Sequence, residues 1–421
     1  PLTKSAVVIG GGIAGMTAES CLADECYPVA LLDQAPALGG LASDISHTVD
    51  GTDVPALIKD LIQKLAANPL VEVLTAARLT TVRGYVGNYH LTVEHNGAPR
   101  DLETGTIVIA TGAHQYKPDS DRWLYGIRPD VLTQLDLEEA MRVDSALVTD
   151  AKDIVMIQCV GSRCDERPYC SRICCAEAVK NALAMKKQWP EKNITILYRD
   201  LRTYGLNELV YEEARQQGIR FIRFDEDGDA RVLEENGALK VEVESTMLGR
   251  AMTLKPDLVV LSAATVADPE NEELAKFFKV PVNDDGFFLE AHVKLRPVDF
   301  ATDGVFLAGL AHSPKLISEA ITQAEAAAAR AATVLAKDYI EAEGTIAKTD
   351  KKRCSGCGAC AEACPYQAID MDEKDGTSVV NEALCKGCGV CAATCRSEAI
   401  TLQGFTDEAV FSEVRALVGI R

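Results

Sequence analysis

The sequence lacks the features of membrane-spanning, secreted and nucleic-acid-binding proteins. None of its apolar runs reaches the roughly 18–20 residues of a membrane-spanning helix, and it opens on a strand pattern instead of a charged and then apolar leader. Basic residues are the minority, with 43 Lys and Arg against 63 Asp and Glu. Because nucleic-acid binding depends on Lys and Arg to neutralise phosphates, we expect a cytoplasmic protein with no membrane span and no nucleic-acid partner.

Cysteine, in contrast, is abundant. Of the 15 cysteines, 13 stand in arrays with metal-ligand spacing, and only Cys21 and Cys26 lie outside them. We predict that these two are buried thiols. An oxidising compartment would pair so many cysteines as disulfides, but the tight spacing and the absence of a leader favour thiolates bound to iron in a reducing compartment.

The densest array is a repeat near the C-terminal end, where Cys-x-x-Cys-x-x-Cys-x-x-x-Cys runs begin at Cys354 and Cys385. In two-cluster bacterial ferredoxins, three thiolates of one run bind three irons of a cubane, and the other run supplies the fourth. A zinc site does not call for two interleaved runs. Arg396 replaces a proline and adds positive charge without removing a ligand. We predict two [4Fe–4S] clusters, one held by Cys354, Cys357, Cys360 and Cys395 and the other by Cys385, Cys388, Cys391 and Cys364.

A glycine-rich loop, Gly10-Gly-Gly12-Ile13-Ala14-Gly15, joins an expected strand at Ala6–Ile9 to an expected helix at Ile13–Leu22. In such loops the first glycine permits the turn, the second admits a pyrophosphate and the third lets helix and strand pack closely. Asp33 ends the next strand, where a carboxylate binds a ribose hydroxyl. The loop alone does not distinguish FAD from NAD.

Three further motifs distinguish an FAD site from an NAD site. Leu38-Gly39-Gly40-Leu41 follows Asp33, Ala110-Thr111-Gly112 closes the unit, and Gly304–Leu310 comes much later. Together they resemble the thioredoxin reductase-like flavoproteins, which have two dinucleotide-binding domains. The resemblance implies FAD at the first site, within reach of Gly10, Gly12, Ile13, Ala14, Gly15, Asp33, Gly39, Gly40, Leu41, Ala110, Thr111, Gly112, Gly309, Leu310 and Lys315.

Strands and helices alternate along most of the chain, which predicts an α/β fold with parallel, doubly wound sheets. We expect two Rossmann-like dinucleotide-binding domains followed by a bacterial-type 2[4Fe–4S] ferredoxin domain, because the composition changes after Glu343. A terminal amphipathic helix should pack on a neighbouring domain or subunit. The expected bounds are 1–148 and 286–342 for the FAD-binding domain, 149–285 for the second domain, 343–404 for the ferredoxin domain and 405–421 for the helix.

The second domain lacks the glycine-rich loop that would bind NAD(P)H. Its first strand, Ile154–Gln158, runs into a segment, Cys159–Cys175, with five cysteines and only Gly161 as glycine. The redox-active Cys-x-x-Cys of disulfide reductases is also absent, which argues against a pyridine-nucleotide disulfide reductase. Thiolates at a strand end and a helix N-terminus could hold a third [4Fe–4S] cluster; structural thiols or zinc are the alternatives.

These motifs resemble one family, the A-type flavoprotein subunits of heterodisulfide reductase (HdrA). The matching stretches are Cys159-Val-Gly-Ser-Arg163, Tyr169–Cys175, Ile196–Tyr204 and Ala311–Lys315, together with the ferredoxin end. The sequence resembles a compact form, without the ferredoxin domain that long members insert in the flavoprotein fold. The resemblance implies that Cys164 is a spare thiol and that the ligands of the third cluster are Cys159, Cys170, Cys174 and Cys175.

The same resemblance implies an FAD-dependent oxidoreductase component that relays electrons between FAD and three clusters, and in long members splits electron pairs. Its partners would be other redox subunits of a hetero-oligomer, of the heterodisulfide reductase B and C type or hydrogenase or dehydrogenase linkers. The chain could also form a dimer. Two rivals are a stand-alone NAD(P)H:ferredoxin-type oxidoreductase and a non-catalytic iron–sulfur scaffold.

Two lysines are candidates for catalytic residues that tune the flavin. Lys315 precedes a helix at the expected flavin position, and Lys180 lies one turn beyond Cys175. A cation there would stabilise a reduced anionic ring; the alternative is that each is a surface lysine. Arg199 and Arg202 are expected in ion pairs or an interface, and His312 is expected to pack or to bond to backbone.

Overall fold

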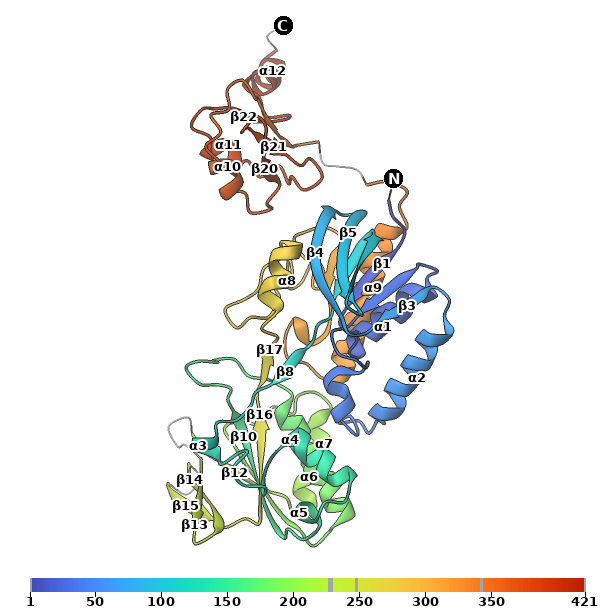
Figure 1. Ribbon diagram of the computed structural model, residues 1–421. Helices are drawn as coiled ribbons and strands as arrows, with labels where there is room; N and C mark the ends of the chain where they lie inside the picture. The colour runs from blue at the N-terminus through green and yellow to red at the C-terminus, as the bar shows by residue number, and fades with distance from the viewer. Residues whose placement is uncertain (1, 226–229, 247–248, 341–343, 420–421) are drawn as a thin grey trace.

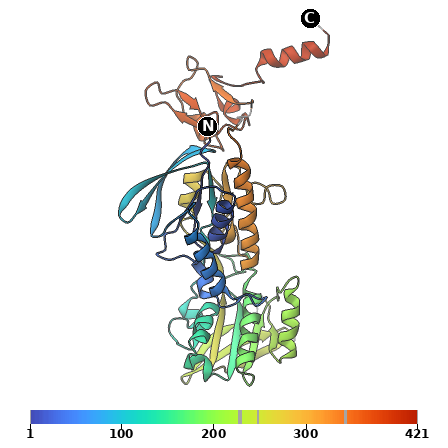
Figure 2. The ribbon, with the colours of Figure 1, turned by 90° about the vertical axis from the view of Figure 1, so that its right-hand side faces the viewer.

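The computed structural model describes residues 2–225, 230–246, 249–340 and 344–419. It places three bodies along one axis: the C-terminal module, a first α/β unit in the middle, and a second α/β unit at the far end (Figures 1 and 2). Within the described residues, no helix is long and apolar enough to cross a membrane. The predicted α/β fold class is confirmed.

The first unit is built on a five-stranded parallel sheet in the order β18-β7-β1-β2-β3. Its central strands are buried on both faces, because helices cover one face and an antiparallel sheet covers the other. The strands are β1 (Ala6–Ile9), β2 (Val29–Leu32), β3 (Val71–Leu74), β7 (Thr106–Ile109) and β18 (Val305–Leu307). The covering elements are α1 (Ile13–Asp24), α2 (Val54–Ala67) and α9 (Ile317–Leu335) on one face, and β4 (Ala77–Tyr85), β5 (Asn88–His95) and β6 (Ala98–Thr104) on the other.

The second unit repeats this plan with a parallel sheet in the order β12-β11-β10-β16-β9. The repetition confirms the predicted duplication of architecture. Its strands are β9 (Val131–Thr133), β10 (Asp153–Val160), β11 (Asn193–Tyr198), β12 (Arg220–Arg223) and β16 (Leu258–Ala263). The surrounding elements are α3 (Ser120–Trp123), α4 (Gln134–Arg142), α5 (Ala146–Thr149), α6 (Cys174–Gln188), α7 (Asn207–Gln216) and the antiparallel β13 (Arg231–Glu235), β14 (Ala238–Ser245) and β15 (Arg250–Leu254).

The chain crosses between the units on an antiparallel pair of strands, β8 (Ala113–Gln115) and β17 (Thr265–Ala267) (Figure 1). Both crossings come earlier in the chain than the domain bounds expected at residues 148 and 285. The second sheet already includes β9, which pairs with β16. The first unit resumes with α8 (Asn271–Phe278), because its apolar face packs into the same core as Phe288 and Phe300.

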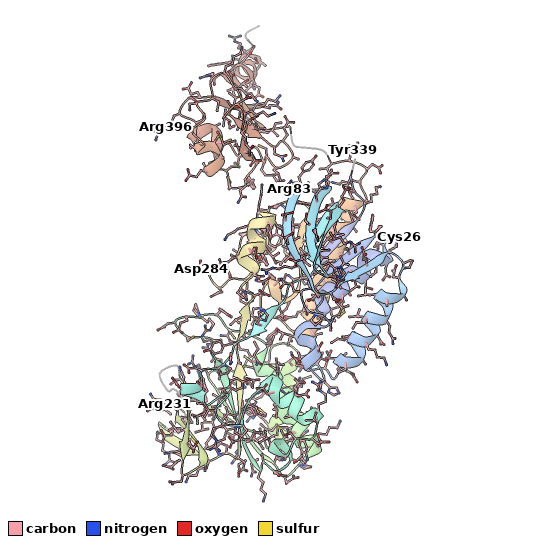
Figure 3. The ribbon with its side chains drawn as sticks, viewed as in Figure 1. Cys26, Arg83, Arg231, Asp284, Tyr339 and Arg396 are labelled. Carbon is pink, nitrogen blue, oxygen red and sulfur yellow. The ribbon has the colours of Figure 1, made fainter. Side chains whose placement is uncertain are left out.

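Two details of the first unit also differ from expectation. The alanine-rich pattern of the sequence predicts a long helix over Ser318–Tyr339, whereas α9 ends at Leu335. Cys26, predicted to be buried, is exposed, because it follows α1 in a left-handed turn with φ of 66° (Figure 3). Cys21 is half-buried.

The C-terminal module contains short strands and helices around its cysteines, and the predicted boundary at residues 342 and 343 lies outside the described residues. Lys386 pairs with Asp303 of the first unit, and Lys279 Nζ donates to the Gln367 carbonyl at 3.0 Å. No described residue of the terminal helix α12 is buried, so α12 packs on no domain of its own chain. The module's elements are β19 (Ala347–Thr349), α10 (Ala359–Glu362), β20 (Ile369–Met371), β21 (Ser378–Val380), α11 (Val390–Thr394), β22 (Ile400–Leu402) and α12 (Asp407–Leu417).

Candidate functional site

A cavity of about 710 Å³ opens at the carboxyl ends of the strands of the first sheet, and residues of the second unit complete its wall. This is the edge at which open α/β sheets bind their ligands. The η1 turn (Gly40–Asp44) and the η2 turn (Gly309–Ala311) lie beside it. Of the predicted cofactor-binding residues, all but Gly15 line the cavity: Gly10, Gly12, Ile13, Ala14, Asp33, Gly39, Gly40, Leu41, Ala110, Thr111, Gly112, Gly309, Leu310 and Lys315.

The glycine-rich loop fits a pyrophosphate. A side chain at Gly10 would meet the Ala110 carbonyl oxygen at 2.2 Å, and one at Gly15 would meet the Gly10 carbonyl oxygen at 1.7 Å. At Gly12 a Cβ would meet nothing within 4 Å, so the space beside it is open to the cavity. No side chain caps α1, which leaves its N-terminal N–H groups available to phosphate.

A Gly12→Ala chain should therefore fold as the parent does but bind FAD at least about tenfold more weakly, a loss of roughly 1.4 kcal/mol. Gly12 has φ of −73° and ψ of −177°, which alanine adopts freely, whereas the added methyl group would stand where the pyrophosphate approaches. Flavin fluorescence titration of the apoprotein measures the affinity. Gly344→Ala, an equal change at an exposed linker glycine, is the control, and equal FAD affinity in the two variants would contradict the prediction.

Asp33 follows β2 as predicted and accepts hydrogen bonds from the backbone N–H groups of Gly11 and, at 2.6 Å, Ala35. Several polar residues of the cavity wall could not be predicted from the sequence, because they come from segments that only the fold brings here. They carry no local motif, and they include His47, Asp50, Arg78, Glu177, Asn207, Asp268 and Glu270.

Lys315 is buried, with only 9% of its surface exposed, and lines the cavity just before α9. Its ammonium donates to the Gly309 carbonyl at 2.6 Å and to the carbonyl and hydroxyl of Ser313 at 2.9 and 3.3 Å. Burial, together with the nearby Arg172 guanidinium, lowers the pKa of Lys315 to about 7. The surface-lysine alternative is thus wrong for Lys315, whose charge changes near neutral pH.

Lys180 also lines the cavity, but its ammonium pairs with the buried carboxylate of Glu138 and donates to the His47 carbonyl at 2.9 Å. The other Glu138 oxygen accepts from the Ser46 N–H at 2.6 Å. Lys180 therefore offsets a buried negative charge. Close by, burial raises the pKa of Glu177 to about 7.

The cysteine segment of the second unit borders the same cavity, which Ile173 lines just before the first residue of α6, Cys174. Cys159, Cys174 and Cys175 are buried, and Cys170 is half-buried. Their charges interact, because Cys170 and Cys175 both raise the pKa of Cys159. The fold thus brings together the four thiols that the resemblance assigns to a cluster. No side chain caps α6, so its N-terminal N–H groups face this segment.

The backbone of the segment is constrained. Cys159, Arg163 and Arg172 all have φ near +60°, a region that costs free energy for residues other than glycine and clusters at functional sites. At Gly161 a Cβ would meet the Tyr116 ring at 2.2 Å. The loop is therefore held in one shape by its surroundings.

The pKa shifts of the thiols indicate which of them need a nearby positive charge to become thiolates. Burial raises the pKa of Cys159 to about 11, so its thiol is neutral unless a cation stabilises the thiolate. A hydrogen bond from Cys174 lowers the pKa of Cys175, and the Arg202 backbone N–H acts in the same direction, while the pKa of Cys174 is raised. A bound iron cluster would supply the positive charge that the Cys159 and Cys174 thiolates need.

The module brings cysteines from the two halves of the repeat together. Four of the predicted ligands line one small cavity: Cys364, Cys385, Cys388 and Cys391. In the other set, Cys354 interacts electrostatically with Cys395, from the opposite half of the repeat. Backbone N–H groups donate to the sulfurs of Cys364, Cys385 and Cys395, each at 3.3 Å. Arg396 is exposed and points outward, so solvent screens its charge (Figure 3).

No three Cys, His, Asp or Glu side chains of the described residues have the spacing that a single metal ion requires.

The remaining candidates have local partners. The side chain of Cys164 bonds to Glu166. Arg199 donates to the Arg163 carbonyl at 2.8 Å. His312 bonds to two side chains instead of backbone, Glu290 at 2.8 Å and Gln323 at 2.9 Å.

Two family models match parts of the chain. The family model described as "Pyridine nucleotide-disulphide oxidoreductase" matches residues 4–157 and ends before the cysteine segment, and the "4Fe-4S dicluster domain" model matches residues 353–399. Among solved structures, thioredoxin reductases of Lactococcus lactis and T. acidophilum share the fold. Their TM-scores are 0.56 and 0.54 at 18% and 15% identity, covering 79% of this chain and 99% and 97% of theirs.

Curated relatives match nearly the whole chain. The iron–sulfur A-subunit of the CoB–CoM heterodisulfide reductase of Methanocaldococcus jannaschii is 33% identical over 97% of this chain and 76% of its own. The A-subunit of the H(2):CoB-CoM heterodisulfide,ferredoxin reductase of Methanothermobacter thermautotrophicus is 32% identical over 98% and 76%. The predicted enzyme class, an FAD-dependent oxidoreductase component with [4Fe–4S] clusters, is confirmed. The chain belongs to the heterodisulfide reductase A-subunit (HdrA) family of iron–sulfur flavoproteins.

Proposed function

We propose that this chain holds one FAD and three [4Fe–4S] clusters and relays electrons between them and partner redox subunits. The observation that carries the proposal is that the cysteine segment borders the cavity through Ile173. Glu177 and Lys180, on the helix that begins at Cys174, line the same cavity. FAD exchanges electrons in pairs or singly, whereas a cluster exchanges them singly. A cluster on Cys159, Cys170, Cys174 and Cys175 would stand beside the flavin as its one-electron partner.

The chain's own residues prepare this site. The glycine-rich loop and the N-terminus of α1 bind phosphate, and Asp33 faces a ribose. Arg172 ties the cysteine segment to the first unit, donating to Glu319 of α9 at 2.8 Å and to the Tyr204 hydroxyl at 2.8 Å. This bridge fixes the proposed cluster relative to the cavity, which electron transfer requires because its rate falls steeply with distance.

The ferredoxin-like module lies away from this site. The cavity stands at the carboxyl edge of the first sheet, whereas the module contacts Asp303, just before β18, at the opposite edge. The first residues of α9 line the cavity, and its 19 residues extend about 28 Å toward the module's side. Efficient transfer between flavin and module within one chain is therefore unfavourable, which supports a relay completed by other subunits.

Helix α12 projects from the module and leaves a surface exposed to partner subunits (Figure 2). Its exposed apolar side chains recur at helical spacing, so they share one face. We propose that an iron–sulfur subunit of the B or C type, or a hydrogenase or dehydrogenase linker, covers this face, which is formed by Val410, Phe411, Val414, Leu417 and Val418.

The stand-alone NAD(P)H:ferredoxin oxidoreductase is the second candidate, favoured only by the match of residues 4–157. It requires a nicotinamide site in the second unit, where cysteines replace the glycine-rich loop. The scaffold alternative predicts clusters that do not change redox state. Anaerobic addition of NADH or NADPH to the reconstituted chain separates them: we expect no flavin bleaching, while dithionite should reduce the clusters.

The direct test is the cofactor content of the chain prepared anaerobically. Three four-iron sites and one flavin predict about twelve irons and one FAD per chain. Colorimetric iron and released FAD, each divided by protein from amino-acid analysis, measure this ratio. About eight irons would rule out the third cluster and leave the ferredoxin-like module intact.

Lys315→Met should lower the midpoint potential of the flavin, because it removes a cation from the cavity wall. A loss of roughly 1.4 kcal/mol of charge stabilisation corresponds to about 30 mV for a two-electron couple. Since the pKa of Lys315 is lowered to about 7, the lysine is charged below that pH, and the difference should be larger at pH 6 than at pH 8.

A spectroelectrochemical titration of the flavin at both pH values measures this difference. Lys117→Met, at an exposed lysine away from the cavity, is the matched control. A potential that Lys315→Met leaves unchanged at pH 6 would remove Lys315 from the flavin-tuning residues.

A further inference from the structure

Two buried donors beside the cysteine segment have no hydrogen-bond partner. Gln158, the residue before Cys159, is 2% exposed, and neither its Nε2 nor its Oε1 is bonded. Arg199 has a buried Nε without a partner. Buried polar groups are nearly always bonded, since leaving one unpaired costs free energy. Two unpaired buried donors at one edge of the sheet therefore indicate that a hydrogen-bond acceptor is missing there.

Both donors lie at the carboxyl edge of the second sheet, where the cysteines are. Side chains alternate along a strand, so Gln158 shares a face with Ile154 and Met156, which pack against α6. Arg199 directly follows β11, the neighbour of β10. Its Nη1 donates to the Arg163 carbonyl at 2.8 Å, so its guanidinium lies against the cysteine segment.

A second buried amide on the same face of the second sheet does form hydrogen bonds, so burial there does not prevent them. Gln134 of α4 donates to the Ser262 hydroxyl at 3.1 Å and accepts from Asn181 at 2.9 Å. Gln158 has no such neighbours, although its side chain is equally buried. The acceptor that Gln158 needs is absent from the side chains and backbone around it.

We propose that Gln158 Nε2 and Arg199 Nε donate to sulfur atoms of the third cluster and raise its reduction potential; the proposal rests on the proposed function. Cluster sulfides and thiolates are acceptors without donors of their own, and hydrogen bonds to them stabilise the more negative, reduced state. Reduction adds one electron to the cluster and breaks no bond. Gln158 and Arg199 are thus positioning residues that make this cluster a better acceptor for electrons from the flavin.

The test compares Gln158→Leu and Arg199→Lys, which remove these donors while keeping size or charge, with Gln134→Leu. The last variant makes the same amide-to-leucine change on the same face, away from the cysteines. An anaerobic redox titration followed by electron paramagnetic resonance reports the potential of the third cluster. The spectrum of a Cys175→Ser chain identifies the signals of the other two.

We expect about twelve irons in each chain, and a fall in the potential of the third cluster in Gln158→Leu and Arg199→Lys alone. A tenfold shift of the equilibrium corresponds to about 59 mV for one electron. Four irons lost from Gln158→Leu but not from Gln134→Leu would also support contact with the cluster, and Arg199→Lys would then report the potential. An unchanged potential, or an equal shift in Gln134→Leu, would overturn the proposal, whereas about eight irons in the parent chain would instead overturn the third cluster itself.

Discussion

A Cys175→Ser chain is expected to bind about eight irons where the parent binds about twelve, and to keep its FAD. Cys175 is buried at the start of α6, beside the other three thiols of the segment. The module lies at the opposite end of the molecule (Figure 1), so its clusters should be unaffected.

Iron analysis gives the stoichiometry, and electron paramagnetic resonance of the dithionite-reduced chain shows which signals persist. Cys164→Ser is the matched control: the same atom is exchanged in the same segment, at a thiol that bonds to Glu166. This variant should retain all of the iron. If Cys164→Ser loses four irons and Cys175→Ser does not, the ligand set is wrong.

Glu19→Gln should stabilise the chain, increasingly so as the pH rises. Glu19 lies on α1 with no exposed surface, and neither carboxylate oxygen has a partner. Burial raises its pKa from 4.5 to about 9. Between these values the folded chain holds a proton that the unfolded chain has lost, so stability falls by about 1.4 kcal/mol per pH unit as the pH rises through this window.

Glutamine does not titrate, so the variant escapes this loss. Its advantage over the parent should be roughly 2.7 kcal/mol larger at pH 8 than at pH 6. Thermal and urea unfolding at the two pH values measure the difference, with tryptophan fluorescence as the probe. Glu325→Gln makes the same change at an exposed position of α9 and should show no such pH dependence. A difference between parent and Glu19→Gln that does not change with pH would show that Glu19 is ionised in the folded chain.

Local patterns in the sequence were sufficient where the chemistry depends on near neighbours. The loop from Gly10 to Gly15 and the two cysteine runs of the module each carry their spacing in a few consecutive residues. Turn geometry and ligand spacing act over that same range. The expected β1, α1 and β10 accordingly agree with the structure to within two residues at each end.

The crossings between units were misplaced because no local signal marks them. β9 and α8 join their sheets through packing with strands far away in the sequence, β16 and β4. The polar residues of the cavity wall escaped prediction for the same reason. The ion pair of Lys180 with Glu138 likewise could not be predicted from the sequence, because Glu138 comes from a different helix.

By itself, the sequence determined that this protein is an α/β flavoprotein with a ferredoxin end and a cysteine segment in place of a nicotinamide loop. Those features belong to motifs of consecutive residues, whose chemistry depends on local spacing. Only the tertiary structure decided that the cysteine segment borders the cavity of the first unit while the ferredoxin-like module stands at the opposite edge of the sheet. Distances between redox centres depend on how separate units pack, and packing is the sum of many contacts between residues distant in the sequence.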